Sequence, residues 1–167
     1  MTDPTPAPAA SSTPRTAAIE AVEALGLAHE VRVIERARSV EEAAERYGVP
    51  VDRLLQTRVV RRGEHDHLFV LVPGPRQLDW PKLRAHLGVS RLSLPDADAA
   101  REATGYERGT ITPFGASQPW PVLADATIAA VGDGQVTIGA GAHGVSLRVA
   151  ADELLAALDA EVADITR

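Results

Sequence analysis

The sequence contains no cysteine among its 167 residues. This absence excludes disulfide bridges, thiolate zinc sites and cysteine nucleophiles. It suits a reducing compartment, so we expect a cytoplasmic protein. Aromatic residues make up only 4% of the chain, and aliphatic side chains must therefore fill the core. No apolar run approaches the roughly 20 residues that a membrane-spanning helix needs, so we expect no membrane partner.

The amino-terminal segment, residues 1–14, consists mainly of proline, alanine, serine and threonine. It lacks the basic start and the apolar stretch that a secretory signal requires. Because nothing in this composition repays the entropy lost on ordering, we expect a disordered tail. The remaining length fits one domain, and we expect residues 15–167 to form it.

The net charge of −6 disfavours sequence-blind binding of nucleic acid. The charge is unevenly distributed, because basic residues outnumber acidic ones between positions 53 and 91 while residues 149–167 are strongly acidic. A locally basic middle segment permits a limited contact with phosphates. A set of solvated arginines is the alternative interpretation, and the sequence leaves both open.

Helix caps and apolar periodicity predict the order of the elements. Helices are expected over 14–25 (capped by Thr13), 39–47, 79–87, 95–104 and 150–162, with a short helical turn at 51–55. Strands are expected over 29–35, 56–62, 67–74, 91–94, 121–125, 135–141 and 145–149, with a hairpin turn at 63–66. This order favours an α+β fold, a single compact domain with a bent, mainly antiparallel mixed sheet (barrel-like) and surrounding helices.

Few residues offer reactive chemistry. His65 and His67 could hold a metal, but they flank Asp66 at a hairpin tip with no third ligand nearby, and we interpret this segment as a solvated turn. Neither GxSxG nor SxxK occurs, which leaves no recognisable serine nucleophile. No GxGxxG follows a strand and no P-loop pattern occurs. We therefore expect no metal and no cofactor.

The loop GYERGTITPFG, residues 105–115, contains three glycines and a proline. Glycine lets a ligand approach the main chain closely, and proline restricts its own backbone and that of the preceding residue. We interpret the segment from Gly109 to Pro113 as a loop that presents main-chain polar groups to a small ligand, with a plain structural turn as the alternative. A second glycine-rich stretch, residues 139–147, is either an ordinary hairpin or the opposite wall of a pocket.

Three segments, GVPVDRLLQTRVV, ATGYERGTITPFG and GAGAHGVSLRVAADELLAAL, occur in an order and spacing that resemble the YbaK/EbsC family. These proteins are ProX-like relatives of the editing domain of bacterial prolyl-tRNA synthetase, and the resemblance covers roughly residues 15–166. It implies a compact α+β fold and an aminoacyl-tRNA deacylase that hydrolyses the ester of a mischarged tRNA, for example a small amino acid on tRNA(Pro). The implied partners are the aminoacylated 3′ end of tRNA and prolyl-tRNA synthetase. No heptad or long apolar patch is visible, so we expect a monomer.

The resemblance also implies residue roles. The catalytic set is Gln56, Gly109, Thr110, Ile111, Thr112 and Pro113, in which the loop positions the ester through its backbone while the substrate's ribose hydroxyl and a water supply the reactivity. The substrate-binding set is Arg58, Gly141, His143, Gly144 and Ser146.

The chain departs from the family at two of these positions. Gln56 stands where the family carries a lysine, and Ser146 where many members carry an aspartate. Glutamine donates hydrogen bonds but brings no charge. Arg58 shares its strand face and is a candidate substitute. The alternative function is therefore a catalytically weakened module that binds aminoacyl-tRNA or aminoacyl-adenosine.

Overall fold

The computed structural model describes residues 14–167, so the tail expected over residues 1–14 lies outside the described residues except for Pro14. The helices are α2 (Ala17–Leu25), α3 (Val40–Tyr47), α4 (Trp80–Leu87), α5 (Ala97–Thr104), α6 (Ala126–Ala129) and α7 (Ala151–Ala157), with a 3-10 turn, η1 (Val51–Arg53). The strands are β1 (Glu30–Val33), β2 (Leu54–Gly63), β3 (Asp66–Pro73), β4 (Val122–Asp125), β5 (Gln135–Gly139), β6 (Val145–Ala150) and β7 (Glu161–Ala163).

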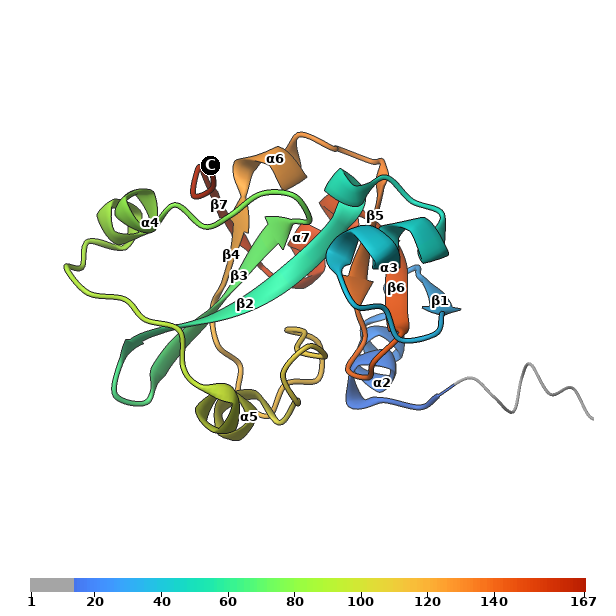
Figure 1. The fold of residues 1–167 in the computed structure, drawn as a ribbon, viewed down its shortest axis with the longest axis horizontal. Coiled ribbons are helices and arrows are strands. Elements are labelled where there is room, and N and C mark those ends of the chain that lie inside the picture. The colour runs from blue at the N-terminus through green and yellow to red at the C-terminus, as the bar shows by residue number, and fades with distance from the viewer. Residues whose placement is uncertain (1–13) are drawn as a thin grey trace, which may run out of the picture.

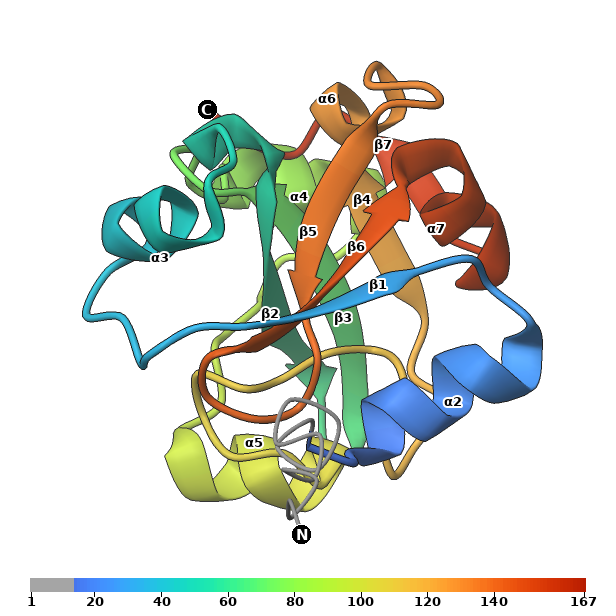
Figure 2. The ribbon, with the colours of Figure 1, turned by 90° about the vertical axis from the view of Figure 1, so that its right-hand side faces the viewer.

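The strands form one seven-stranded sheet in the order β1-β6-β5-β2-β3-β4-β7. The pairs β1–β6, β5–β6 and β2–β3 are antiparallel, whereas β2–β5, β3–β4 and β4–β7 are parallel. The longest ladder is the β2–β3 hairpin, and the parallel pairings are short. Figures 1 and 2 show that β1, β5 and β6 turn across the direction of β2 and β3. The α+β fold with a bent mixed sheet is confirmed, and within residues 14–167 the sheet stays open at β1 and β7.

The helix caps come from short sequence signals that act locally. The side chains of Ser39, Asp79 and Asp96 accept hydrogen bonds from main-chain N–H groups three residues on, at 3.0, 3.1 and 2.8 Å. Thr16 does the same for Ile19 N–H at 3.1 Å, so α2 begins at Ala17 and its cap is Thr16 rather than the expected Thr13. Each of these caps satisfies a donor that the first helical turn leaves unpaired.

Two expected elements differ from the structure. The closing helix, expected over 150–162, ends at Ala157, and the chain turns at Asp159 with φ 49° before β7 pairs with β4. The strand expected over 91–94 is reduced to one bridge, in which Ser93 exchanges hydrogen bonds of 2.8 and 3.1 Å with Arg61. Both differences depend on which distant strand edge is available, which local patterns do not encode.

The core lies on both faces of the sheet. Phe69 and Leu71 of β3 belong to the cluster that packs against α2 and α7, while Val70 and Val72 belong to the cluster under α4. Because both faces of β3 are buried, its sequence is a continuous apolar run rather than an alternating one. This central hairpin is the rigid base from which β2 reaches the site described below.

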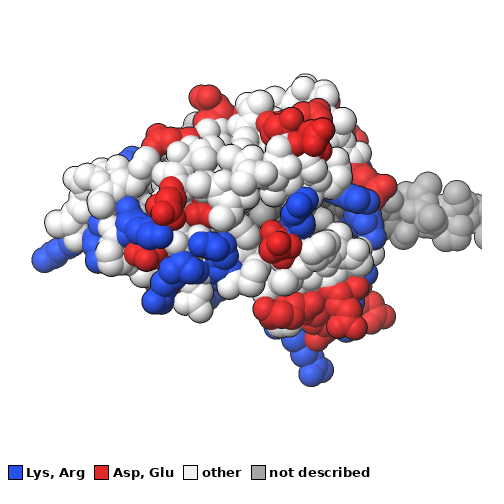
Figure 3. Space-filling view, turned by 90° about the horizontal axis from the view of Figure 1, so that it is seen from above, with Lys and Arg blue, Asp and Glu red and all other residues white. Residues whose placement is uncertain are grey.

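Acidic side chains are concentrated on helix α3. Figure 3 shows one face, on which Asp and Glu gather over α3 with Lys and Arg side chains beside them, while other acidic and basic groups are interspersed over the rest of this face. Helix α3 contributes Glu41, Glu42 and Glu45, of which Glu42 pairs with Arg46 at 2.8 Å. Such an exposed pair contributes little to stability, so this patch affects chiefly the electrostatic field.

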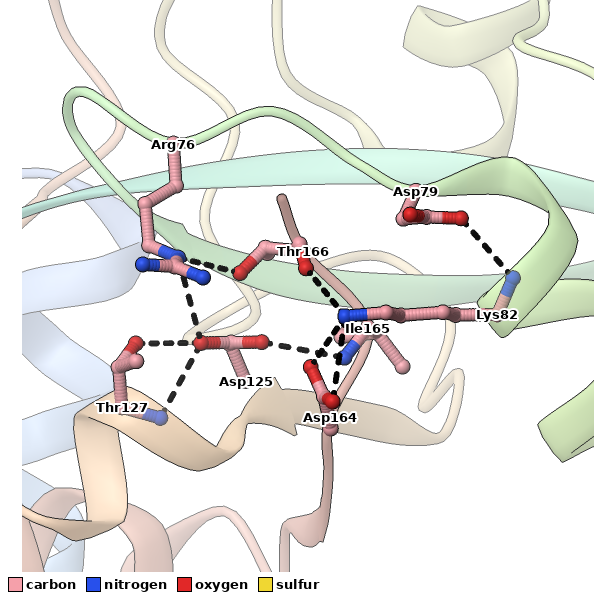
Figure 4. A network of polar contacts seen from close by, with 8 residues as sticks. All are labelled: Arg76, Asp79, Lys82, Asp125, Thr127, Asp164, Ile165 and Thr166. Atoms are coloured by element: carbon pink, nitrogen blue, oxygen red, sulfur yellow. Dashed lines mark hydrogen bonds and ion pairs between the residues drawn. The ribbon is translucent and has the colours of Figure 1, made fainter.

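The carboxyl-terminal segment is fastened by a buried carboxylate, Asp125, at the end of β4 (Figure 4). Asp125 accepts hydrogen bonds from the main-chain N–H groups of Thr127 and Ile165, each at 3.1 Å, and from the Thr127 hydroxyl. Burial alone would raise the pKa of Asp125, but these hydrogen bonds outweigh it and hold the pKa below its ordinary value. The carboxylate therefore stays ionised and ties the last residues to the sheet.

Candidate functional site

A cavity of about 460 Å³ opens where β2 and β5 diverge. The two strands pair only at Leu54 and Leu55, so the following part of β2 is left without a partner on that side. The cavity is lined by residues 54–59 of β2, by the segment leading into α3, by the turn at 108–111 and by the glycine-rich stretch. Loop segments far apart in the sequence thus converge on one exposed strand edge.

Seven of the eleven residues that the sequence singles out line this cavity: Gln56, Arg58, Gly109, Thr110, Ile111, Gly144 and Ser146. Thr112, Pro113, Gly141 and His143 do not line it. Thr112 is fully buried, and its hydroxyl has no hydrogen-bond partner among the described residues. His143 contacts Glu107 instead, through a hydrogen bond of 2.9 Å. The structure thus brings most of the predicted set together around the cavity, whereas the other four residues do not line it.

The turn at Glu107–Thr110 has a conformation that requires glycine. Gly109 has φ 90°, which side chains rarely adopt. Thr110 closes the turn, since its main-chain N–H and its hydroxyl both donate to the Glu107 carbonyl, at 2.9 and 2.7 Å. The turn therefore holds one fixed shape against the cavity.

The rest of the loop is anchored on both sides of this turn. The Tyr106 hydroxyl donates to the Phe114 carbonyl at 2.6 Å, and burial raises the pKa of Tyr106 to about 12. A Cβ at Gly115, where φ is 69°, would lie 2.5 Å from the Ala17 main chain, so the loop packs directly onto the start of α2. This close packing explains why the segment is so rich in glycine.

The glycine-rich stretch forms the facing wall. A Cβ at Gly144 would lie 2.2 Å from the Ile34 carbonyl oxygen, and Gly144 accepts a hydrogen bond from Ile34 N–H at 2.8 Å. A Cβ at Gly141 would lie 2.7 Å from the Tyr106 ring. The two interpretations left open by the sequence both hold, because the stretch is a tight connection between β5 and β6 and also a cavity wall.

The charge of the cavity lining is opposite to that of the whole chain. Four arginines line it, Arg36, Arg38, Arg58 and Arg108, and no Asp or Glu is among the described residues that do. The net charge of the chain is −6. A concave surface lined by one sign of charge concentrates ligands of the other sign. The cavity is therefore suited to an anionic ligand such as a phosphate-bearing chain end.

Neutral hydrogen-bonding groups occupy the cavity between these arginines. The Gln56 amide donates to the Gly74 carbonyl only across 3.5 Å, a long contact that leaves its second N–H available. The hydroxyl of Thr57 is buried, lines the cavity and has no hydrogen-bond partner among the described residues, and that of Ser146 lies beside the Tyr47 hydroxyl. Burial raises the pKa of Tyr47, which also lines the cavity, so its hydroxyl stays protonated at neutral pH. Buried polar groups that lack protein partners are suited to bind a polar ligand.

Sequence reasoning missed several of these residues. Thr57 is adjacent to Gln56, and Tyr47 is the last residue of the correctly predicted α3. Arg36, Arg38 and Arg108 lie in loops, where arginine is usually solvated. The excess of basic residues between positions 53 and 91 pointed to Arg58 but not to these three, because the cavity gathers arginines from three separate segments.

At the hairpin tip, one of the two histidines differs from the sequence-based interpretation of a solvated turn. His67 is buried, and its ring lies edge-on to Trp120 with centroids 5.0 Å apart, so the solvated turn was wrong for this residue. His65 is exposed beside Glu64. Within residues 14–167 no three His, Cys, Asp or Glu side chains are grouped so that they could hold a metal ion. No helix in that same part of the chain is both long and apolar enough to cross a membrane.

Comparisons with known proteins point to one family. The sequence model described as "Aminoacyl-tRNA editing domain" matches residues 34–157. The "Putative Cys-tRNA(Pro)/Cys-tRNA(Cys) deacylase EbsC" of Enterococcus faecalis is 30% identical over 132 residues, which is 77% of each chain. A solved structure described as a "putative trans-editing enzyme for prolyl tRNA synthetase" superposes with a TM-score of 0.80 at 28% identity, covering 90% of this chain and 95% of that one.

A proline–tRNA ligase of Thermosipho africanus is 35% identical over 81 residues, which is 48% of this chain but only 14% of the ligase. The chain is therefore similar to a small part of that enzyme. The matched residues 34–157 include every cavity-lining residue named above. The chain belongs to the aminoacyl-tRNA editing domain family.

Proposed function

We propose that this chain, through a domain spanning residues 15–167, is an aminoacyl-tRNA editing deacylase that hydrolyses the ester of a mischarged tRNA. One observation carries the proposal: a conformationally fixed main-chain turn at Gly109 and four arginines line the same cavity. An aminoacylated tRNA end combines a polar ester with a chain of phosphates. The cavity offers a binding group for each.

The reaction follows from that arrangement. The arginines bind phosphates of the tRNA end, and the main chain of residues 109–111 holds the ester in one orientation. A water attacks the carbonyl carbon, the bond from that carbon to the ribose oxygen breaks, and the products are a free amino acid and a tRNA with a free hydroxyl. The ribose hydroxyl next to the ester takes part in proton transfer, as the family resemblance implies. The reaction is accelerated by the orientation of the ester and by the fixed dipoles of the main chain, and no strong protein base is needed to activate the water.

The substrate is a small amino acid on tRNA(Pro). A cavity of about 460 Å³ must hold both the terminal nucleoside and the aminoacyl group, which leaves little room for a large side chain. Two of the similar proteins carry names that refer to Cys-tRNA(Pro) and to prolyl-tRNA synthetase. We propose prolyl-tRNA synthetase as a functional partner, a cytoplasmic location and a monomer as the active form.

The experiment is deacylation of a panel of mischarged tRNAs. We expect hydrolysis of at least one small aminoacyl ester above the spontaneous rate. Arg58→Gln should lower the affinity for that substrate and flatten its dependence on salt, because one phosphate contact is lost. The matched control is Arg15→Gln, which removes an exposed arginine that pairs with Glu23 at 2.7 Å and does not line the cavity. If no ester of the panel is hydrolysed faster than in buffer, the proposal is wrong.

The binding module without catalysis remains less favoured. This alternative was suggested by the neutral residues Gln56 and Ser146, because the family carries a lysine at the first position and many members carry an aspartate at the second. The cavity does not lack positive charge, because Arg58 lines it two residues from Gln56 and three further arginines surround it. Binding of an aminoacyl-adenosine analogue together with intact esters would favour the module.

A further inference from the structure

A hydrogen-bonded histidine–glutamate pair links the Gly109 turn to the glycine-rich stretch, and both of these loops form walls of the cavity. The pair itself lies outside the cavity lining. His143 Nε2 lies 2.9 Å from Glu107 Oε1. Because a carboxylate only accepts hydrogen bonds, Nε2 carries the proton and donates it. Neither residue lines the cavity, so the pair is not explained as part of the binding surface.

Glu107 is also the first residue of the turn that contains Gly109. Its carbonyl accepts both hydrogen bonds from Thr110, while its carboxylate reaches across to the other wall. The hydrogen bond from His143, and then the charge of that residue, lower the pKa of Glu107, with smaller effects from Arg36 and Arg101. The acceptor is therefore ionised at neutral pH.

The imidazole of His143 lies directly against Gly109. A Cβ at Gly109 would lie 3.1 Å from His143 Cε1 and 3.7 Å from Nδ1. The ring thus covers the side of the turn that faces the glycine-rich stretch. The turn is held at two points, by packing on Gly109 and by the hydrogen bond to Glu107.

The stretch that carries His143 is itself fixed. Ala140 N–H donates to the Val145 carbonyl at 3.0 Å, and Gly144 is bonded to Ile34 at 2.8 Å. Gly141 packs on the ring of Tyr106. A rigid connection between β5 and β6 therefore positions the imidazole, and the imidazole in turn positions the Gly109 turn.

We propose that His143 is a positioning residue, which holds the Gly109 turn against the cavity through Glu107, and not the substrate-binding residue that the sequence suggests. The kinetic consequence rests on the proposed deacylase function, whereas the contact itself is a property of the free protein. Loss of the imidazole lets the turn move, and a displacement of about 1 Å costs up to roughly 100-fold in rate. The substrate loses no direct contact, so the effect belongs to kcat.

The first arm of the test is a double-mutant cycle on kcat and KM. His143→Ala and Glu107→Ala should each lower kcat about tenfold with KM within about twofold, and the double variant should be no worse than either single one. His143→Gln, whose amide nitrogen can reach the place of Nε2, should retain kcat within about threefold. The control is His86→Ala, from a second His–Glu pair with Glu161 that joins α4 to β7 outside the cavity lining. Its side-chain exposures, 30% and 65%, match the 26% and 66% of His143 and Glu107, and its kcat should not change.

The second arm measures amide hydrogen exchange in the substrate-free protein at Thr110, whose N–H donates to the Glu107 carbonyl and closes the turn. We expect exchange about tenfold faster in His143→Ala and in Glu107→Ala, and no change in His86→Ala. This measurement does not require enzymatic activity. If the wild-type protein shows no deacylase activity, the proposed function is refuted, but the exchange rates still test whether His143 positions the turn. Unchanged exchange, an additive double variant, or a higher KM with unchanged kcat would each overturn the proposal, the last because it would mean direct contact with the substrate.

Discussion

Replacing Gly109 with alanine tests whether catalysis depends on the shape of the main chain. The residue has φ 90°, and the new Cβ would lie 3.1 Å from His143 Cε1. Forcing an L-residue into such a conformation costs about 1–2 kcal/mol. If the turn in this variant can relax to another conformation whose free energy is lower by this amount, only roughly one tenth of the molecules keep the original turn.

We therefore expect Gly109→Ala to fold and to lose about tenfold in kcat/KM, because apparent activity scales with the competent fraction. The assay is deacylation of the best tRNA from the panel, together with urea unfolding. The matched control is Gly88→Ala at the end of α4, where φ is 68° but a Cβ meets nothing within 4 Å. That variant should lose about 1 kcal/mol of stability and no activity. Equal kcat/KM in wild type and Gly109→Ala, with stability reduced in both variants, would refute the reasoning.

Three further changes test other parts of the structure. Gln56→Lys should raise kcat/KM by up to about tenfold at low salt, since a charge-assisted hydrogen bond replaces a neutral one, and an unchanged or lower value would contradict this. Burial, followed by the charge of Arg61, lowers the pKa of His67 below its ordinary 6.5, so stability is lost as the pH falls from 6.5 through the lowered pKa. Urea unfolding of His67→Leu should show a weaker loss over that window, and an identical pH profile would argue against the role. Asp125→Ala should cost about 3 kcal/mol because it leaves the buried N–H of Ile165 unpaired, and a loss below about 1 kcal/mol by the same method would count against it.

Local signals were sufficient for much of the fold. The caps at Ser39, Asp79 and Asp96 act within three residues, so the sequence predicts α3, α4 and α5 well. Strand β7 was missed because residues 161–163 look helical in isolation. They become a strand because the free edge of β4 and the hydrogen bond from Ile165 N–H to Asp125 hold them there. Such pairings depend on positions 40 residues apart and have no local signature.

The site was predictable in its backbone and less so in its side chains. The glycine and proline pattern indicated a fixed loop, since positive φ angles and close main-chain packing restrict residue identity directly. The role of Arg36 and Arg108 was not visible, because an arginine in a loop becomes a cavity residue only when distant segments converge. His143 was assigned to the substrate because the family resemblance implies that role for the glycine-rich stretch, whereas in the structure its ring is hydrogen-bonded to Glu107.

For the proposed tRNA substrate, the contrast between an acidic chain and an arginine-lined cavity affects how that ligand would be selected. A uniformly basic surface would bind any tRNA through its many phosphates, and binding would be strong but unselective. The net charge of −6 and the acidic side chains of α3 oppose such contacts. Attraction is then concentrated where four arginines meet, and only a single-stranded chain end can enter a cavity of this size. Under the proposed function, selection would therefore rest on the geometry of the walls, so that the rigidity of the Gly109 turn and of the glycine-rich stretch would matter more than the number of positive charges.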